Sequence, residues 1–507
     1  MLYIKLLHFT GLLCAAYLLA AIARNWAQSA ALFLYICKIM EASYSEAGYL
    51  RLVQDIFRRF PSVQKDGFTP GAYKPGLERM RAFEDALGHP SRRFRSVHVA
   101  GTNGKGSVAN MLASACTSCG LKTGLFTSPH LVDFRERICV NGELIPKEYV
   151  FSFLSEWMNW IVTHELSFFE ITTGLAFSWF AAQKVDIAII ETGLGGRLDS
   201  TNILEQPQLT IVTSIGLDHC DLLGHTLPEI AAEKAGIFKE SVPALVGERQ
   251  EETASVFDEK AWMFCPLTYA DELKPSLWSH HAQMLKQMDL QAQVQEKNLR
   301  TVLAAVDILK ENDAFALLRN DAAVTDGILH TASNMHFHGR WERLSTQPFV
   351  IADIGHNAHA LQHNFRQLQE MLAGGFCSSL IIVYGIMADK DLDAILPLMP
   401  ENATYIFTSP ETPRALPADD ILRRFNAYRA AQKPDDAKSQ DYQGTVTLSS
   451  RAYAFTSVRY AVQMAVQLAQ NLSQQLSRSA SAEKPAPPLI YIGGSTFVVA
   501  EALPLFK

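Results

Sequence analysis

The sequence lacks an excess of basic residues: 45 Lys and Arg stand against 52 Asp and Glu, for a formal net charge of −7. General nucleic-acid binders neutralise phosphates with such an excess, so we expect no nucleic-acid partner. Closely spaced cysteines are also scarce, since only Cys116 and Cys119 of the eight lie near each other. One such pair cannot complete a four-ligand zinc site. We expect both residues to lie in a helix and the chain to work in a reducing compartment.

Residues 1–39 lack an uninterrupted membrane span. Two apolar runs, 11–22 and 30–36, are separated by Arg24 and Asn25, before the roughly 20 apolar residues of a full span are reached. A signal peptide, an anchor, a buried helix and a start placed too far upstream all remain open, although no small-residue cleavage site stands out. Ordinary soluble sequence begins at Met40, which favours the last interpretation. We therefore expect a cytoplasmic protein, with membrane contact only if residues 1–39 are real.

A chain of 507 residues is too long for one ordinary core, so we expect two domains. In the first, 40–330, short apolar runs alternate with helical patterns, which is typical of a parallel sheet covered by helices on both faces. The clearest strands are predicted at 96–100, 123–127, 186–190 and 209–215.

The second predicted domain, 331–507, is a smaller α/β unit, and the boundary is expected near 325–340. Its strands are predicted at 349–354, 380–385, 404–408 and 489–493, alternating with helices such as 359–372. The hydrophilic segments 432–444 and 473–488 are predicted to be loops, the second because it is low-complexity Ser, Ala and Pro sequence.

A phosphate loop is predicted directly after the first strand, at residues 101–107 (GTNGKGS). Glycines let backbone N–H groups close around phosphates, the following helix N-terminus favours negative charge, and Lys105 can reach the terminal phosphates. The usual G-x-x-x-x-G-K-[ST] pattern is not met, because Val99 takes the first glycine position and Gly106 separates Lys105 from Ser107. A glycine-rich turn without a ligand is the alternative.

Three further strands are followed by groups that suit a hard cation: Ser128, Glu191 and His219. Ligands collect at the carboxyl ends of parallel strands, and Mg²⁺ takes few protein ligands besides phosphate and water oxygens. Each residue also has an ordinary structural explanation: a helix cap, a strand-end ion pair and a turn histidine. Their shared position favours a magnesium site beside the phosphate loop.

Eight segments together resemble the folylpolyglutamate synthase and dihydrofolate synthase family of the Mur ligase superfamily. In chain order they are GTNGKGS, FTSPHL, ETGLGGRLDSTN, TSIGLDH, EKAGIFK, HGRWERL, ADIGHN and YGIMADKD. The resemblance runs from about residue 45 to the C-terminus. It implies a large P-loop-type parallel-sheet ATPase domain and a smaller α/β domain, with the active site in the cleft between them. It also implies ATP-dependent ligation of L-glutamate to dihydropteroate, to reduced folate polyglutamates, or to both.

The resemblance assigns roles to individual residues. Lys105, His219 and Lys234 are implied to be the catalytic set. Lys234 is implied to carry a carbamate that binds a second Mg²⁺ beside the ion held by Ser128, Glu191 and His219, although a lone lysine at such a position is usually a solvated helix residue. ATP contacts are implied for Gly104, Lys105, Gly106, Ser107, Asn298, Arg340, Asp353 and His356. A pterin surface is implied for Gly76, Leu77, Glu78, Arg79, Phe169, Glu170 and Arg197.

Two segments depart from the family pattern. The usual D-G-A-H-N-P is Asp353-Ile-Gly-His-Asn-Ala here, which keeps Asp353, His356 and Asn357, and the usual H-Q-x-x-N is V-Q-E-K-N, ending in Asn298. Another Mur-type amino-acid ligase and a nucleotide-binding module without catalysis are the competing interpretations. The protein is expected to be a monomer.

Overall fold

The structure is a computed structural model that describes residues 44–67, 74–262, 264–274, 276–432, 451–479 and 486–506. The apolar extension 1–39, and all but the first residue of the predicted loop 432–444, lie outside the described residues. The described residues divide into two compact units: one combines those before residue 61 with 146–166, and the other combines those of 61–145 with those after residue 166. Along the described ranges, no helix combines the length and apolar composition needed to cross a membrane.

The described part of the smaller unit is a pair of helices, α2 (Glu46–Arg59) and α6 (Lys147–Thr163). Tyr49, Leu52 and Ile56 are buried on α2, at the spacing that places side chains on one helical face. Gly48 allows close approach, since a Cβ there would lie 3.3 Å from the Phe151 ring. The amphipathic face of α2 therefore explains why these helices associate.

The larger unit contains an eight-stranded sheet with the order β4-β3-β2-β5-β1-β6-β7-β8. The four predicted strands are present as β1 (Arg95–Ala100), β2 (Thr123–Phe126), β5 (Ile187–Glu191) and β6 (Leu209–Val212). They are adjacent and parallel, so their carboxyl ends meet at one edge. The other strands are β3 (Ile138–Val140), β4 (Glu143–Leu144), β7 (Ala244–Val246) and β8 (Leu267–Tyr269).

Helices cover this sheet, and together with it they form what we call the central lobe. The glycine-rich loop leads into α5 (Lys105–Ser118), which packs against α12 (Gln295–Leu309) and α13 (Asp321–Leu329). Small residues permit that contact: the Ser114 hydroxyl donates to the Gly327 carbonyl at 2.6 Å. Cys116 is buried in α5 and Cys119 is its C-cap, which confirms the helix predicted for them.

The remaining helices of the central lobe flank these elements. They are α3 (Val63–Asp66), α4 (Glu78–Ala86), α7 (Phe168–Gln183), α8 (Cys220–Leu223), α9 (Leu227–Ala235), α10 (Glu251–Trp262), α11 (His281–Gln287) and α14 (Thr331–Met335). Short 3₁₀ helices cover Pro90–Arg93, Phe134–Arg137, Ser200–Ile203, Trp278–His280 and Asp313–Arg319.

A six-stranded sheet with the order β13-β12-β11-β14-β10-β9 forms the C-terminal lobe. Its strands are β9 (Glu342–Thr346), β10 (Phe349–Asp353), β11 (Leu380–Tyr384), β12 (Ala403–Thr408), β13 (Ala452–Phe455) and β14 (Leu489–Gly493). Only β9 is antiparallel to its neighbour. The four strands predicted here are therefore confirmed.

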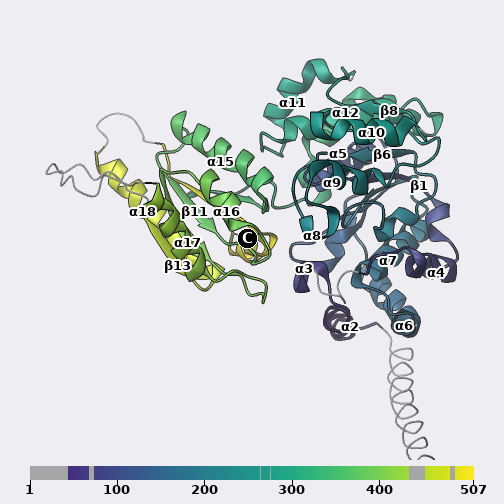
Figure 1. Ribbon diagram of the computed structural model, residues 1–507, viewed down its shortest axis with the longest axis horizontal. Helices are drawn as coiled ribbons and strands as arrows, with labels where there is room; N and C mark the ends of the chain where they lie inside the picture. Colours follow the sequence, from purple (N-terminus) through teal and green to yellow (C-terminus); the bar gives the residue numbers. More distant parts are fainter. Residues whose placement is uncertain are drawn as a thin grey trace, which may run out of the picture. The chain divides into compact units, whose positions relative to one another are not determined.

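Both faces of this second sheet are covered, because alternate residues of each strand point to opposite sides. On β11, Ile382 packs with α15 (Ala358–Ala373), α16 (Leu392–Ile395) and α17 (Ala418–Ala431). Ile381 and Val383 pack with α18 (Val458–Ser479) and α19 (Thr496–Ala502). Figure 1 draws α15 and α18 on opposite sides of β11. The 3₁₀ helices of this lobe are Leu396–Leu398 and Leu503–Phe506.

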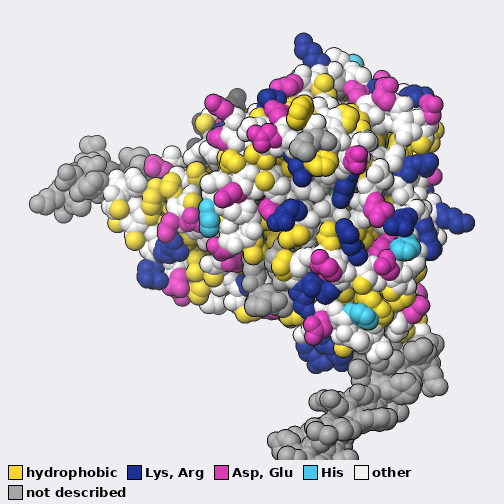
Figure 2. Space-filling model, turned by 45° about the vertical axis from the view of Figure 1, so that its right-hand side comes forward, with side chains coloured by type: hydrophobic (Ala, Val, Ile, Leu, Met, Phe, Trp, Pro, Cys, Tyr) yellow, Lys and Arg dark blue, Asp and Glu magenta, His cyan; other side chains and the backbone are white. Residues whose placement is uncertain are grey.

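The prediction of a loop at 473–488 is wrong for the first part of that segment. Residues 473–479 are the last turns of α18, because Gln, Leu and Arg are good helix formers and Leu472 packs against the core beneath. Residues 486–488 have no regular structure, as predicted. On the face drawn in Figure 2, Lys and Arg side chains are interspersed with Asp and Glu side chains.

Candidate active site

The glycine-rich loop joins β1 to α5 in the predicted strand–loop–helix arrangement. Gly101 and Gly104 both have positive φ, 151° and 85°. A Cβ on Gly101 would lie 1.9 Å from the Thr213 hydroxyl oxygen, and one on Gly104 would lie 2.4 Å from the Asn298 side-chain oxygen. Both glycines are therefore required by close packing as well as by backbone conformation.

The phosphate loop is tied to the segment that follows β6. The Asn103 carbonyl accepts hydrogen bonds from the hydroxyls of Thr213 at 2.6 Å and Ser214 at 3.1 Å. The Thr102 hydroxyl donates to the Gly216 carbonyl, also at 3.1 Å. These hydrogen bonds couple the position of the phosphate loop to that of the segment after β6. That segment carries His219, a predicted metal ligand.

Two lysines converge on one backbone oxygen of this loop. The carbonyl of Gly101 accepts from Lys105 Nζ at 3.0 Å and from Lys234 Nζ at 2.8 Å. Lys234 is only 3% exposed, so it is not the solvated residue that its sequence context alone suggested. Burial, reinforced by the charge of Lys105, lowers its pKa to about 7. A large share of Lys234 is therefore an uncharged amine near neutral pH.

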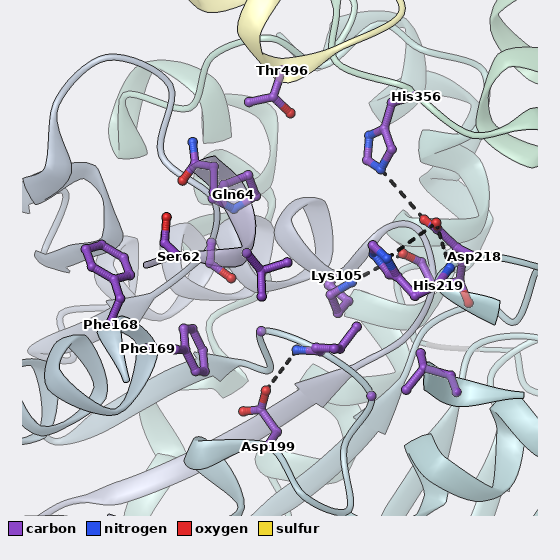
Figure 3. Close-up of a pocket in the computed structure, with 18 of the residues that line it drawn as sticks. Ser62, Gln64, Lys105, Phe168, Phe169, Asp199, Asp218, His219, His356 and Thr496 are labelled. Atoms are coloured by element: carbon purple, nitrogen blue, oxygen red, sulfur yellow. Dashed lines mark hydrogen bonds and ion pairs between the residues drawn. The ribbon is translucent and has the colours of Figure 1, made fainter. Parts of the chain in front are cut away.

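A cavity of about 250 Å³ opens beside these lysines. In the view of Figure 3, Phe168 and Phe169 lie at one side of the cavity and Lys105, Asp218 and His219 at the other. Its wall includes six of the predicted site residues, which are Lys105, Ser128, Phe169, His219, Lys234 and His356. One cavity thus combines an aromatic wall with a basic end, where phosphate binding is predicted.

Glu191 and Ser128 meet at the ends of β5 and β2. The Ser128 backbone N–H donates to a carboxylate oxygen of Glu191 at 3.1 Å. Burial raises the pKa of Glu191, although the positive charges of Lys105, Arg340 and Arg137 oppose that rise. The buried carboxylate of Glu191 offers hard oxygen donors of the kind that Mg²⁺ binds.

His219 lines the same cavity and has a positive φ of 53° directly before α8. Burial lowers its pKa to about 3, against the opposing charge of Asp218, so the imidazole is neutral, which is the metal-binding form. Within the described ranges, no group of three or more His, Cys, Asp and Glu side chains could hold a metal by itself. Ser128 and His219 both line the cavity, and Glu191 accepts from the Ser128 backbone; cation binding by these three residues stays a prediction.

Asp218 joins the central lobe to the C-terminal lobe. Its carboxylate accepts from Lys390 Nζ at 2.7 Å and from the Asn357 side-chain amide at 2.9 Å, and His356 lies 3.7 Å away. Burial alone would raise the pKa of Asp218, but the hydrogen bond to His356 and nearby basic groups, Lys390 among them, hold that pKa well below its usual range. The carboxylate is therefore ionised at the cavity edge.

Comparison with known proteins agrees with this geometry. Residues 99–295 match the Mur ligase middle domain, and residues 339–474 match the Mur ligase glutamate ligase domain. The chain is 34% identical over 400 residues to the dihydrofolate synthase/folylpolyglutamate synthase of Bacillus subtilis (strain 168), covering 73% of this chain and 87% of that relative. The chain belongs to the dihydrofolate synthase/folylpolyglutamate synthase family of Mur ligases.

Solved structures of this family share the fold across most of the chain. Mycobacterium tuberculosis folylpolyglutamate synthase complexed with ADP has a TM-score of 0.73 at 25% identity, covering 91% of this chain and 98% of that one. Escherichia coli FolC in complex with DHPP and ADP has a TM-score of 0.65 at 27% identity, covering 87% and 95%.

Arg340 and Asp353, the family residues predicted to hold ATP from the C-terminal lobe, occupy different environments. Arg340 reaches the phosphate-loop helix, since its guanidinium lies 3.4 Å from the position of a Cβ on Gly106. Asp353 is buried and accepts from the Trp341 and Gly355 backbone N–H groups at 2.9 and 2.7 Å. It therefore fixes the backbone that follows Arg340.

Asn298, the family asparagine predicted to contact adenine, lies next to the phosphate loop. Its amide donates to Gln295 at 2.8 Å, and Gln295 donates to the Ser107 hydroxyl at 3.4 Å. The helix α12 is thereby linked to the first turn of α5. The adenine contact itself stays a prediction.

Of the residues predicted to bind pterin, Phe169 is the one on the cavity wall. Glu170 is buried, closes a capping box with Ser167 and lies 3.2 Å from Arg79 in an ion pair. Arg197 pairs with Glu233 at 2.7 Å and leaves 57% of its side chain exposed. Gly76, Leu77 and Glu78 lead into and begin α4. For these residues the structure shows structural contacts, and pterin binding stays a prediction.

Several cavity residues were not singled out from the sequence. They are Asp218, Lys390, Arg137, Arg414 and Asp199. Asp218, Lys390 and Asp199 fall inside the family segments TSIGLDH, YGIMADKD and GGRLDSTN. These segments indicated that the residues lie near the site, but not that their side chains point into the cavity. Arg414 has no such signal; it joins the cavity because it donates to the Val63 and Gln64 carbonyls at 3.0 and 2.6 Å.

Proposed function

We propose that this protein joins L-glutamate to dihydropteroate, to tetrahydrofolate polyglutamates, or to both, through an acyl phosphate. Membership of the family makes the chain a folate–glutamate ligase that uses ATP. The observation that carries the mechanism is the convergence of Lys105 and Lys234 on the Gly101 carbonyl, at the basic end of a cavity with an aromatic wall.

In the first step, an oxygen of the folate or pteroate carboxylate bonds to the γ-phosphorus of ATP, and the bond from that phosphorus to the β-phosphate oxygen breaks, releasing ADP. In the second step, the glutamate amine attacks the acyl carbon, loses a proton, and inorganic phosphate leaves. Lys105 stabilises charge on the transferring phosphoryl group. The enclosing walls position the reactants and keep water from the acyl phosphate.

Lys234 fits the carbamate that the family resemblance implies. An uncharged amine bonds to the carbon of CO₂ and releases a proton, and the product is an anion able to bind a cation. A pKa of about 7 supplies the uncharged amine, and burial at 3% exposure protects the product from water. Lys234 would then hold a second divalent ion.

A divalent cation would be held by Ser128, Glu191 and His219, and when bound it would neutralise charge on the phosphates. Two such sites, a monomeric state, the absence of a nucleic-acid partner, a cytoplasmic location and the division into domains 40–330 and 331–507 complete the proposal.

Another Mur-type amino-acid ligase and a nucleotide-binding module without catalysis remain the alternatives. The deciding experiment supplies ATP, Mg²⁺ and L-glutamate, and adds dihydropteroate or tetrahydrofolate in turn. Phosphate release that requires one of the two pterins supports the proposal and says which reaction the enzyme performs. Release without either pterin favours another Mur-type ligase or an ATPase, and no release favours the binding module.

A further inference from the structure

Asn357 uses the whole hydrogen-bonding capacity of its side-chain amide. Its oxygen accepts from the Ala360 backbone N–H at 2.9 Å, as the N-cap of α15, and from the Asn103 amide at 3.3 Å. Its nitrogen donates to Asp218 at 2.9 Å and to the Asn103 amide oxygen at 3.2 Å. Asn357 is 6% exposed. One buried side chain of the C-terminal lobe therefore holds two separate loops of the central lobe.

The orientation of this amide is determined by its neighbours. An N-cap must present an acceptor to the first turn of its helix, so the oxygen of Asn357 faces Ala360. The nitrogen then faces Asp218, whose carboxylate can only accept. Asn103 therefore turns its amide nitrogen toward the oxygen of Asn357 and its oxygen toward the nitrogen of Asn357. Its second N–H then donates to His359 Nδ1 at 3.0 Å.

A purely structural role does not account for this arrangement. Capping α15 needs one acceptor, and serine would provide it as well as asparagine does. Three of the four hydrogen bonds of Asn357 instead reach the central lobe. Two of them end on Asn103, inside the phosphate loop, and the third ends on Asp218, next to His219.

We propose that Asn357 is a positioning residue for ligation, acting through Asn103 and Asp218. It aligns the phosphate loop and the segment after β6 with the C-terminal lobe. The proposal rests on the proposed function, because the reaction it serves is glutamate ligation. Loss of the amide contacts should leave ATP bound to the loop but poorly aligned, so kcat falls more than the KM for ATP rises.

A double-mutant cycle tests this proposal with Asn103→Ala, Asn357→Ser and the double variant. Serine keeps the cap and removes the amide. We expect each single variant to lose about tenfold in kcat, and the double variant to lose about the same, because contacting residues are strongly non-additive. The KM for ATP of Asn357→Ser should stay within about threefold of the wild type. Asn320→Ser is the matched control, since Asn320 caps α13 through Ala323 and is exposed.

Three results would overturn the proposal: losses that multiply in the double variant, wild-type kcat in Asn357→Ser, or losses that merely follow the melting temperature. Asn357→Asp, which also keeps the cap acceptor, replaces the serine variant if that one does not fold. A wild-type enzyme without ligation would refute the proposed function instead. In that case the shift in melting temperature caused by ADP is measured for the wild type, both single variants and the double variant. Changes in this shift that add up in the double variant contradict the coupling, and non-additive changes support it.

Discussion

The amines of Lys105 and Lys234 donate to the same oxygen, the carbonyl of Gly101, at 3.0 and 2.8 Å. Two cationic groups this close repel each other, and the buried one responds by losing its proton more easily. The lysine proposed to bind phosphate and the lysine proposed to carry a carbamate are thus electrostatically coupled.

Replacing Lys105 with alanine should lower kcat for ligation by at least about 10²-fold, because a preorganised charge at the transferring phosphoryl group is lost. The fold should persist, since the hydrogen bonds of this side chain to described residues go to carbonyls of its own loop. Steady-state ADP release and circular dichroism measure the two effects. Lys122→Ala is the control. Lys122 bonds to Gln183 at the amino end of β2, whereas the candidate site lies at the carboxyl ends of the strands. Near-normal turnover in Lys105→Ala would contradict the assigned role.

Lys234 should take up CO₂ in a pH-dependent way. Its pKa of about 7 means that the reactive amine becomes more abundant as the pH rises through 7. With ¹³C-labelled CO₂ held at constant dissolved concentration, a carbamate resonance should grow between about pH 6 and 8. Lys234→Ala should lose both that resonance and ligation while staying folded. A resonance that survives in the variant, or full activity without it, would rule the carbamate out.

A methyl group on Gly101 should abolish nucleotide binding. The added carbon of Gly101→Ala would lie 1.9 Å from the Thr213 hydroxyl oxygen, so the phosphate loop must move. Gly120→Ala is the matched control: Gly120 also has positive φ, 90°, but no atom lies within 4 Å of the new carbon. The Gly120→Ala substitution should lower the free energy of unfolding by only about 1 kcal/mol. Calorimetric titration with ADP measures binding, and equal affinity in both variants would contradict the tight packing.

Burial of His98 predicts loss of stability in mild acid. This β1 residue is fully buried, its Nε2 lies 2.8 Å from the Thr201 hydroxyl oxygen, and burial lowers its pKa to about 3. Between pH 6.5 and 3 the unfolded chain binds a proton that the folded chain does not, so this contribution to stability falls as the pH falls through 6.5.

From pH 6.5 to 5, the His98 contribution should decrease by about 2 kcal/mol. Urea unfolding at both pH values measures the change, with His98→Gln as the reference that does not titrate. A pH dependence identical in the two proteins would show that His98 is not the responsible group.

The eight predicted strands could be located because each is a short, mostly apolar run with buried residues on both faces. The partly exposed strands β4, β9 and β13 have no such run. Ser128, Glu191 and His219 could be grouped because each follows a strand of one parallel sheet, and the strands concerned, β2, β5 and β6, lie with β1 in the order β2-β5-β1-β6. Side-chain direction was beyond reach: Glu170 turns inward to close a capping box that its spacing from Ser167 could have indicated. Contacts between distant segments, such as Asp218 with Lys390, depend on how the two lobes meet and leave no local pattern.

The acyl phosphate is tested most directly by isotope transfer. Dihydropteroate or tetrahydrofolate, whichever proves to be the substrate, is labelled with ¹⁸O in the carboxylate that accepts glutamate and incubated with ATP, Mg²⁺ and L-glutamate. The mechanism predicts that each phosphate released carries one ¹⁸O, because the carboxylate oxygen bonded to the γ-phosphorus leaves with it. Phosphate free of ¹⁸O, formed together with the glutamylated product, would contradict it.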